Sequence, residues 1–328
     1  MIEIKHLVKK YGDHTAVDDL SLTVEPGKIY GFLGPNGAGK STTMNIITGY
    51  LGATSGEVII NGHDIFKEPE EAKKCIGYLP EIPPLYGDMT VLEYLNFTAE
   101  LKRLEKKQRK EYVESAMETT GVTEVAGRLI RNLSKGYRQR VGFAQALLGY
   151  PEIIILDEPT VGLDPKQIIE IRDLIRKLGE KHTVILSSHI LTEISAVCDH
   201  VFIISKGKLV ASNSTENLVG MMSGAQEILL TVRGDGNEAK QLLRMAEQIE
   251  RVETYKSMED MGENEREEQE HQQETSLRIY ARTGSDVREQ VFHLMAEHQI
   301  PVLEMHTVTK SLEDVFLEIT TEGGQEAC

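Results

Sequence analysis

Short runs in which apolar and polar residues alternate begin the chain, and this pattern predicts β-strands. The runs are IEIKHLV, KIYGFLG and GEVIING. Two later runs, IIIL and TVILSS, have the apolar character that is typical of buried strands in a parallel sheet. The segment DPKQIIEIRDLIRKLGEK between them predicts an amphipathic helix, which Asp164 is suited to cap and Pro165 to begin. Strand, helix and strand in this order form a βαβ unit, so we expect an α/β core.

From Thr90 onward the pattern becomes helical and strongly charged, which predicts a largely helical insert near residues 85–150 within a first domain over residues 1–220. Strand and helix patterns then follow in β-α-β-β-α-β order, and they predict a small ferredoxin-like α+β domain over residues 225–328. Residues 257–274, between its two middle strands, contain eight acidic residues and one arginine. This run is too charged to pack, so we expect a disordered loop, with an acidic docking segment as the alternative.

Composition limits the kinds of partner. A formal charge of -16 at pH 7 argues against a general affinity for nucleic acid. The three cysteines are far apart and lack metal-binding spacing, which favours free thiols in a reducing cytoplasm. The N-terminus lacks the apolar core of a signal peptide, and no apolar run approaches the roughly 18 residues that span a bilayer. Any membrane role is therefore expected to depend on another subunit.

The segment GPNGAGKST matches the phosphate-loop motif G-x-x-x-x-G-K-[ST] completely, between a predicted strand and a predicted helix. In such a loop, backbone N–H groups and the helix N-terminus bind the β-phosphate of a nucleotide. Lys40 is expected to bridge the β- and γ-phosphates and Ser41 to bind magnesium. An ordinary glycine-rich turn is the alternative. The residues expected at this site are Gly34, Pro35, Asn36, Gly37, Ala38, Gly39, Lys40, Ser41 and Thr42.

Two further polar positions follow buried strands. Asp157 and Glu158 end the run IIILDE, at the sheet edge where ligands of parallel sheets bind. We expect Asp157 to position magnesium and Glu158 to act as general base toward water, the alternative being a solvated turn. His189 follows the next buried strand, so it is expected to contact the γ-phosphate, although a lone histidine is often structural. Tyr11 precedes the phosphate loop and could stack on adenine or pack as partial core.

The stretch RNLSKGYRQRVGFAQALL predicts a helix capped by Ser134, yet its first residues suit an anion better than packing. If the helical insert projects from the core, this turn cannot fold back onto Lys40 of the same chain. It could reach the phosphate loop of a second copy packed head to tail. Ser134 and Gly136 would then bind the γ-phosphate across an interface that also buries Asp164.

These motifs, in this order, resemble those of the ATP-binding cassette (ABC) ATPases over essentially the whole chain. The resemblance implies a P-loop NTPase core with a RecA-like lobe, an antiparallel β region and a helical subdomain. It assigns Lys40, Ser41 and Thr42 to Walker A, and Asp157 to Walker B. Its remaining implications are Glu158 as catalytic base, His189 as switch histidine, Tyr11 as adenine-stacking residue, Ser134 and Gly136 as signature turn, and Asp164 as D-loop.

Two departures from the family pattern matter. Lys135 and Tyr137 replace a glycine and the glutamine of the signature, but Ser134 and Gly136 remain, so γ-phosphate capture is expected to survive. Glu81 stands where the family normally has a glutamine that touches magnesium and senses the membrane subunit. A carboxylate can also bind magnesium, but it repels the γ-phosphate. Altered nucleotide affinity or coupling is therefore expected, unless Glu81 faces solvent.

The chain resembles one branch of the family, the ATPase subunits of bacterial exporters for drugs, antibiotics, lipids or gliding-motility components. This resemblance depends on both departures, on the appended domain and on the closing segment KSLEDVFLEITTE. The segment IPPLYGDMTVLEYL would, by this resemblance, receive a cytoplasmic helix of a permease, with a plain proline-rich turn as the alternative. We therefore expect a magnesium-dependent ATPase at the cytoplasmic face of the membrane, which dimerises on ATP and drives a separate permease.

Two other functions remain as alternatives. One is a non-transport ABC ATPase for DNA repair or translation. The short insert, the single phosphate loop and the acidic charge argue against it. The other is a regulatory nucleotide-binding module without turnover, against which the intact Lys40, Asp157, Glu158 and His189 argue.

Overall fold

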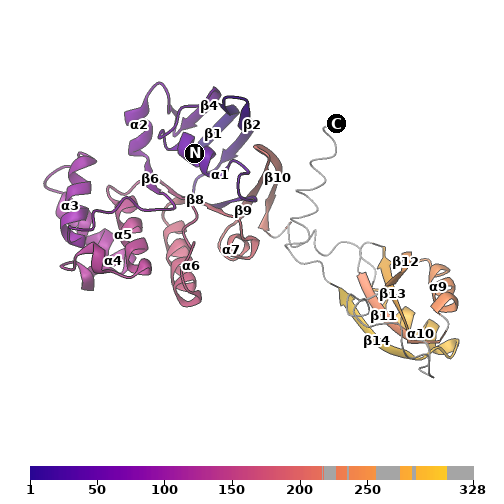
Figure 1. Cartoon of the computed structure of the whole chain (residues 1–328). Helices are drawn as coiled ribbons and strands as arrows, with labels where there is room; N and C mark the ends of the chain where they lie inside the picture. Colours follow the sequence, from indigo (N-terminus) through magenta and orange to yellow (C-terminus); the bar gives the residue numbers. More distant parts are fainter. Residues whose placement is uncertain (216, 218–226, 235, 256–273, 283–285, 309–328) are drawn as a thin grey trace. The chain divides into compact units, whose positions relative to one another are not determined.

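The computed structural model describes residues 1–215, 217, 227–234, 236–255, 274–282 and 286–308 (Figure 1). The chain divides into two units, of which the first comprises residues 1–215 and the second lies within residues 216–315. Apart from Glu274, the predicted acidic loop lies outside the described residues, as does the closing segment KSLEDVFLEITTE. Within those described residues, no helix is long and apolar enough to cross a membrane.

A six-stranded sheet forms the centre of the first unit, and all its strands are parallel except the edge strand β10. Its strands, in spatial order, are β10 (Lys208–Ser214), β9 (His200–Ser205), β3 (Ile29–Leu33), β8 (Thr183–Ser188), β7 (Ile153–Leu156) and β6 (Ile76–Leu79). Every residue of β3, β7 and β8 is buried, as expected for strands covered on both faces. The sequence prediction of an α/β core is confirmed.

Helices α1 (Lys40–Ile47), α6 (Pro165–Gly179) and α7 (Leu191–Ser195) follow strands β3, β7 and β8 of this sheet. Helix α6 begins as its sequence predicts, because the Asp164 carboxylate accepts a hydrogen bond from Gln167 N at 2.9 Å and Pro165 occupies the first turn. Its apolar face buries Ile171, Leu174, Ile175 and Leu178.

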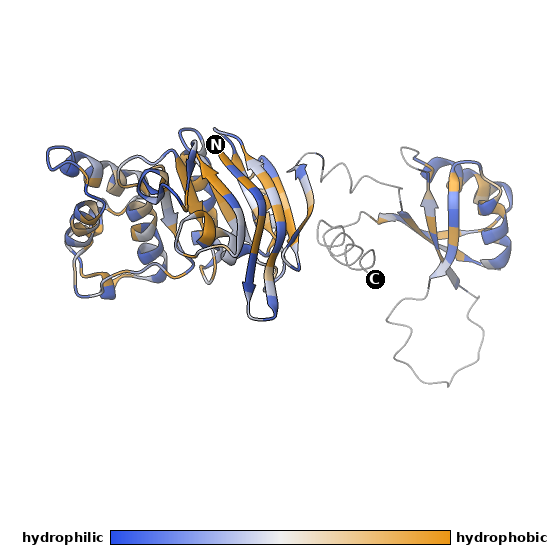
Figure 2. Cartoon of the chain, turned by 90° about the horizontal axis from the view of Figure 1, so that it is seen from above, coloured by the Kyte–Doolittle hydropathy of each residue, from blue (hydrophilic) through white to orange (hydrophobic). Residues whose placement is uncertain are grey.

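An antiparallel sheet in the order β2-β1-β4-β5 packs on this core. Its strands are β1 (Ile2–Tyr11), β2 (His14–Val24), β4 (Ser55–Ile60) and β5 (His63–Asp64). Buried residues of both sheets and of α1, such as Ile4, Phe32, Met44 and Ile60, belong to one apolar cluster. Figure 2 shows hydrophobic residues concentrated along the strands of this unit.

The helical part of the unit lies at one end, where α3, α4 and α5 group together (Figure 1). Its elements are α3 (Val91–Leu101), α4 (Arg109–Thr120), the 3₁₀ turns Thr123–Val125 and Ile130–Asn132, and α5 (Lys135–Leu147). Helix α2 (Pro69–Lys74) is separate from this group and packs against β5 and β6 (Figure 1). The long helical pattern after Thr90 is thus divided between α3 and α4, and Arg103 lies in the left-handed region between them with φ 55°. Thr90 and Glu93 form a capping box at the start of α3.

In its described residues, the second unit has a four-stranded antiparallel sheet in the order β12-β13-β11-β14 and two helices. Its elements along the chain are β11 (Glu227–Arg233), α9 (Gly236–Arg244), β12 (Ile249–Tyr255), β13 (Glu274–Ala281), α10 (Arg288–Glu297) and β14 (Val302–Val308). Leu230, Leu243, Leu277 and Val291 lie at the centre of its own apolar core. This succession is the β-α-β-β-α-β order of ferredoxin-like domains.

Candidate active site

The carboxyl ends of four adjacent strands meet at one edge of the parallel sheet. The phosphate loop follows β3, His189 follows β8, Asp157 and Glu158 follow β7, and Glu81 follows β6 with one residue between. Because β3, β8, β7 and β6 are parallel neighbours, chain segments up to about 150 residues apart are brought to the same place.

Glycines allow the phosphate loop to pass close to other backbone segments. Gly39 has φ 104°, and a Cβ atom on it would lie 2.5 Å from the Ala16 carbonyl oxygen. A Cβ atom on Gly34 would lie 2.3 Å from the Ile204 carbonyl oxygen. Helix α1 starts directly after Gly39 and has no acidic residue in its first turn, so its N-terminus and its partial positive charge are available to an anion.

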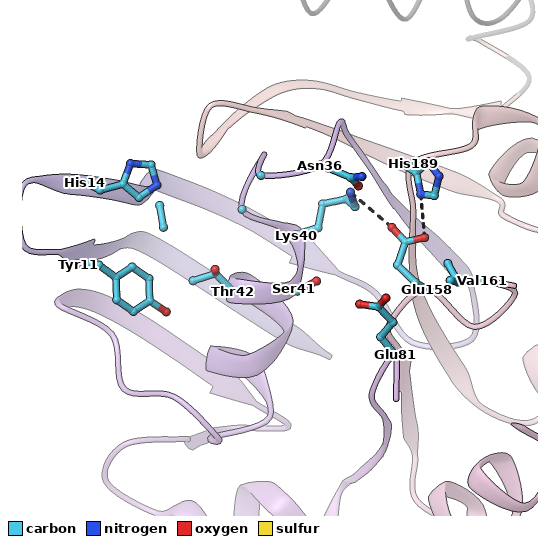
Figure 3. Close-up of a pocket in the computed structure, with 13 residues that line it drawn as sticks. Tyr11, His14, Asn36, Lys40, Ser41, Thr42, Glu81, Glu158, Val161 and His189 are labelled. Carbon is cyan, nitrogen blue, oxygen red and sulfur yellow. Dashed lines mark hydrogen bonds and ion pairs between the residues drawn. The ribbon is translucent and has the colours of Figure 1, made fainter. Parts of the chain in front are cut away.

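Lys40, Glu158 and His189 form a connected set of charged and polar side chains (Figure 3). The Lys40 ammonium donates to the Gly34 carbonyl oxygen at 2.7 Å and lies 3.5 Å from Glu158 Oε1. The other carboxylate oxygen of Glu158 lies 3.1 Å from His189 Nδ1. Lys40 and Glu158 are 5% and 7% exposed, whereas His189 remains partly open to solvent. Glu158 therefore has one oxygen toward a cation and the other toward an imidazole.

The backbone of Glu158 is itself unusual, because its φ is 46°. Residues other than glycine, asparagine and aspartate seldom adopt this conformation, and such strain concentrates at functional sites. The hydroxyl of Ser187 stabilises the turn by accepting a hydrogen bond from Glu158 N at 2.9 Å. The turn thereby directs Glu158 and the preceding Asp157 to different partners.

Asp157 faces the start of α1. Its Oδ1 accepts hydrogen bonds from Ser41 Oγ at 3.1 Å and from Ser187 Oγ at 2.6 Å. A hydroxyl and a carboxylate oxygen at this separation suit a magnesium ion, which takes few protein ligands together with phosphate and water oxygens. No cluster of three histidine, cysteine or acidic residues suitable for a metal occurs among the described residues.

The hydroxyl of Tyr78, on β6, donates a hydrogen bond to Asn45 Oδ1 at 3.0 Å. Burial, and secondarily the negative charge of Asp157, raises the pKa of Tyr78 well above its ordinary value. Tyr78 therefore remains a neutral donor at physiological pH and does not compete for the proton chemistry of the site.

A cavity of about 420 Å³ runs along the phosphate loop. It is lined by Tyr11, His14, Ala16, Asn36, Gly37, Gly39, Lys40, Ser41, Thr42, Glu81, Glu158, Val161 and His189. Tyr11 and His14 lie at the opposite end from Glu158 and His189, with the phosphate loop between them (Figure 3). This length and polarity suit a ligand with a ring at one end and phosphates at the other.

Several predicted site residues are not part of the cavity lining. Gly34 and Pro35 contribute carbonyl oxygens that accept from Lys40, and Ala38 is buried.

Glu81 is exposed, yet it lines the cavity. Tyr11 is 49% exposed, and the Lys9 ammonium lies 5.0 Å from the centroid of its ring.

The signature-turn residues lie outside this cavity. Ser134 is exposed and caps α5 as predicted, because its Oγ accepts from Tyr137 N at 3.3 Å. Lys135 extends across Gly162, where an added Cβ atom would lie 2.1 Å from its Nζ atom. The side chain of Gln167 covers Gly136, and Asp164 is exposed at the cap of α6. Within one chain these residues are thus not brought to the phosphate loop.

Sequence reasoning missed three residues that organise the site. Ser187 joins Asp157 to the backbone of Glu158, Gln139 donates from α5 to the Pro159 carbonyl oxygen at 2.9 Å, and His14 faces the cavity. The only available signal was that Ser187 and Gln139 are polar residues within otherwise apolar patterns, and their partners are 20 to 30 positions away.

The chain is similar to known transporter ATPases. A family model described as "ABC transporter" matches residues 17–161. The chain is 35% identical over 325 residues to the bacitracin transport ATP-binding protein BcrA of Bacillus licheniformis, which covers 98% of both chains. It is 31% identical over 321 residues to the linearmycin resistance ATP-binding protein LnrL of Bacillus subtilis, again covering 98% of each.

A solved structure is similar to about two thirds of this chain. The dimeric structure of a post-hydrolysis state of the ATP-binding cassette MJ0796, bound to ADP and Pi, has a TM-score of 0.59 and 26% identity. The match covers 66% of this chain and 99% of that one.

Proposed function

Because the chain belongs to the family of ABC transporter ATP-binding proteins, it is an ATPase subunit of a transporter, and we propose that two copies bind ATP head to tail to power a separate membrane permease. The observation that carries this proposal is the division of the site. The cavity contains the phosphate loop, Glu158 and His189, whereas Ser134 and Gly136 lie outside it. A second copy would supply the missing side.

ATP would bind along the cavity with its adenine beside Tyr11 and its phosphates in the loop from Gly34 to Thr42. Tyr11 is half exposed and lines the cavity, which supports stacking on the base. Lys40, which lies beside the carbonyl oxygens of the loop, would turn to the β- and γ-phosphates.

The negative charge of the site supports the binding of ATP together with a divalent cation. Asp157, Glu158 and Glu81 place three carboxylates near one lysine at the phosphate end, and this arrangement would repel a bare polyphosphate. Ser41 and Asp157 are the residues that would hold Mg²⁺, and Glu81 is a further candidate ligand. When bound, the ion would neutralise charge on the phosphate oxygens.

In the hydrolytic step Glu158 would accept a proton from the attacking water as the water oxygen bonds to the γ-phosphorus and the bond to the β-phosphate oxygen breaks. His189, in contact with Glu158, would orient the γ-phosphate and the water. Lys40 would stabilise the negative charge that spreads over the phosphate oxygens. Catalysis would thus depend mainly on positioning and electrostatics.

The partner copy would approach with its own signature turn. Ser134 and the backbone of Gly136, at the start of α5, would bind the γ-phosphate of the opposite site. Lys135 would add positive charge there, and Asp164 would lie in the same interface. Both Ser134 and Asp164 are exposed, which supports this role.

A permease would bind next to Glu81. A cavity of about 860 Å³ there is lined in part by Tyr50 and Ile82, which are 83% and 82% exposed, and Tyr86 lies exposed nearby along the chain. Apolar side chains on an open surface support an amphipathic helix of the permease as occupant. We place the subunit at the cytoplasmic face of the membrane, without nucleic acid as a partner. The names of its relatives, bacitracin transport and linearmycin resistance, support export of antibiotic-like compounds.

The second unit has its own core and is proposed as an accessory domain over residues 225–328, attached to the ATPase domain of residues 1–220 with its helical subdomain near residues 85–150. Nothing in the chemistry above requires its side chains.

Replacement of Glu158 by glutamine tests the proposed hydrolysis. The variant should bind ATP with an affinity within about threefold of the unmodified protein but hydrolyse it at least about 100-fold more slowly, because an amide cannot accept the proton. Phosphate release and nucleotide binding measure the two quantities. Unchanged turnover in the variant would contradict the role of Glu158.

A further inference from the structure

A buried carboxylate lies between the two turns that carry Glu158 and His189. Glu193, in the short helix α7, is 8% exposed. It belongs to no ion pair among the residues that the structure describes. Its hydrogen-bond partners are hydroxyl groups, one from each turn.

The two hydroxyls reach the same carboxylate oxygen. Thr160 Oγ1 donates to Glu193 Oε2 at 2.5 Å, and Ser188 Oγ donates to it at 3.3 Å. Thr160 stands two residues after Glu158, and Ser188 directly precedes His189. Thr160 and Ser188 are both buried, so these contacts are shielded from competing water.

A carboxylate in a protein core lowers the stability of the fold. A buried carboxylate without a cationic partner is desolvated, and an apolar side chain of similar size would avoid that penalty. Its placement is understandable if it fixes the two turns. We propose that Glu193 is a positioning residue that sets the separation of Glu158 and His189, now 3.1 Å, for ATP hydrolysis; this inference rests on the proposed function.

The phosphate loop follows another strand, β3, and has no contact with Glu193 among the hydrogen bonds described. Loss of Glu193 should therefore displace the catalytic pair while ATP binding persists. Small displacements of reacting groups lower a rate strongly, whereas a KM that reflects binding changes little.

The first experiment compares Glu193→Leu, Glu193→Gln and the control Thr192→Val, which lies exposed on the same helix. The leucine variant should lower kcat by roughly 10- to 100-fold with KM within about threefold. The glutamine variant keeps a carbonyl oxygen that accepts both hydroxyls, so its kcat should return to within about threefold of the unmodified value. The control should match the unmodified protein.

The second experiment distinguishes positioning from support of the fold. Thr160→Val and Ser188→Ala should each lower kcat by roughly threefold to tenfold, and their effects should be non-additive because both hydroxyls use one oxygen. In a Glu193→Leu background Thr160→Val should have no further effect, whereas Ser188→Ala still removes the hydrogen bond that Ser188 Oγ accepts from Ile190 N at 3.0 Å. This cycle between Thr160 and Ser188 can be measured even if the leucine variant does not fold.

An unchanged kcat in folded Glu193→Leu, or independent and additive effects of Thr160→Val and Ser188→Ala, would overturn the proposal. So would a glutamine variant as impaired as the leucine variant. Absence of turnover in the unmodified protein would instead contradict the proposed function itself.

Discussion

At the residue scale, the site is defined by charges that the fold has partly removed from water. Glu158 combines burial with a left-handed backbone, and each feature alone destabilises the fold by about 1–3 kcal/mol or more. Lys40, His189 and the hydroxyl of Ser187 offset part of this free energy through direct contacts. Because Lys40 and His189 are also the side chains that ATP would engage, ligand binding and the electrostatics of the turn would be coupled.

Glu81 is the residue at which repulsion of the nucleotide can be measured. Glu81→Gln removes one carboxylate from the cavity, so ATP without divalent cation should bind more tightly, by about fivefold for an interaction of about 1 kcal/mol. Calorimetric titration with ATP in a chelator checks this. The exposed Glu105→Gln is the control, and an unchanged or weaker affinity of the Glu81 variant would count against repulsion.

Lys102 gives a pH dependence of stability. Its ammonium donates to the Leu148 carbonyl oxygen at 3.0 Å, and burial of that charged end lowers the pKa of Lys102 from 10.5 to about 8, although the side chain as a whole remains exposed along an open cavity. Between these values the unfolded chain binds more protons than the folded one. The contribution of Lys102 to the free energy of unfolding must therefore increase as pH rises from about 8 to 10.5.

The measurement is the difference in Tm between the unmodified protein and Lys102→Met, followed from pH 7 to pH 10. This difference should shift in favour of the unmodified protein as pH rises. Lys106→Met, at an exposed position, shows the effect of losing any lysine in this region. A difference that stays flat, or that shifts toward the methionine variant, would show that desolvation of Lys102 is unimportant.

At the element scale, four strand ends and the start of one helix assemble the site. Sequence predicted these segments well, because a phosphate loop, an acidic strand end and a buried strand before His189 are local patterns. It did not predict the contacts of Ser187, Glu193 or Gln139, because each depends on a partner that topology brings near from another strand or helix. The division of the helical segment between α3 and α4 was also missed, since charged residues at helical spacing do not mark a turn.

Strand β6, which precedes Glu81, packs closely against helix α5, which begins at the signature turn. A Cβ atom on Gly77 would lie 2.1 Å from the Ala146 carbonyl oxygen and 2.9 Å from Pro151 Cγ. Gly77→Ala should therefore lower the free energy of unfolding by about 1–3 kcal/mol, as expected for overpacking against backbone.

Urea denaturation followed by far-UV circular dichroism checks this, since the chain contains no tryptophan for fluorescence. Gly127→Ala is the matched control, because a Cβ atom there would meet nothing within 4 Å. A Gly77 variant as stable as this control would show that β6 and α5 can separate without penalty.

At the scale of the whole molecule, one chain carries only part of the proposed ATP site. One chain brings together a phosphate loop, a base and a histidine, but presents its signature turn elsewhere on its surface. On the function proposed above, such a molecule would complete its site with a second copy, which would make ATP part of the interface. The second unit has a separate core of its own.

The most direct test is the mass in solution of the Glu158→Gln protein with saturating ATP and magnesium, measured by light scattering after size exclusion. Without ATP the mass should be that of one chain, 36.7 kDa, and with ATP it should double. Ser134→Arg added to the same protein should keep it monomeric, since the larger side chain obstructs the partner's γ-phosphate. A Glu158→Gln protein that binds ATP yet stays at the mass of one chain would contradict the shared site.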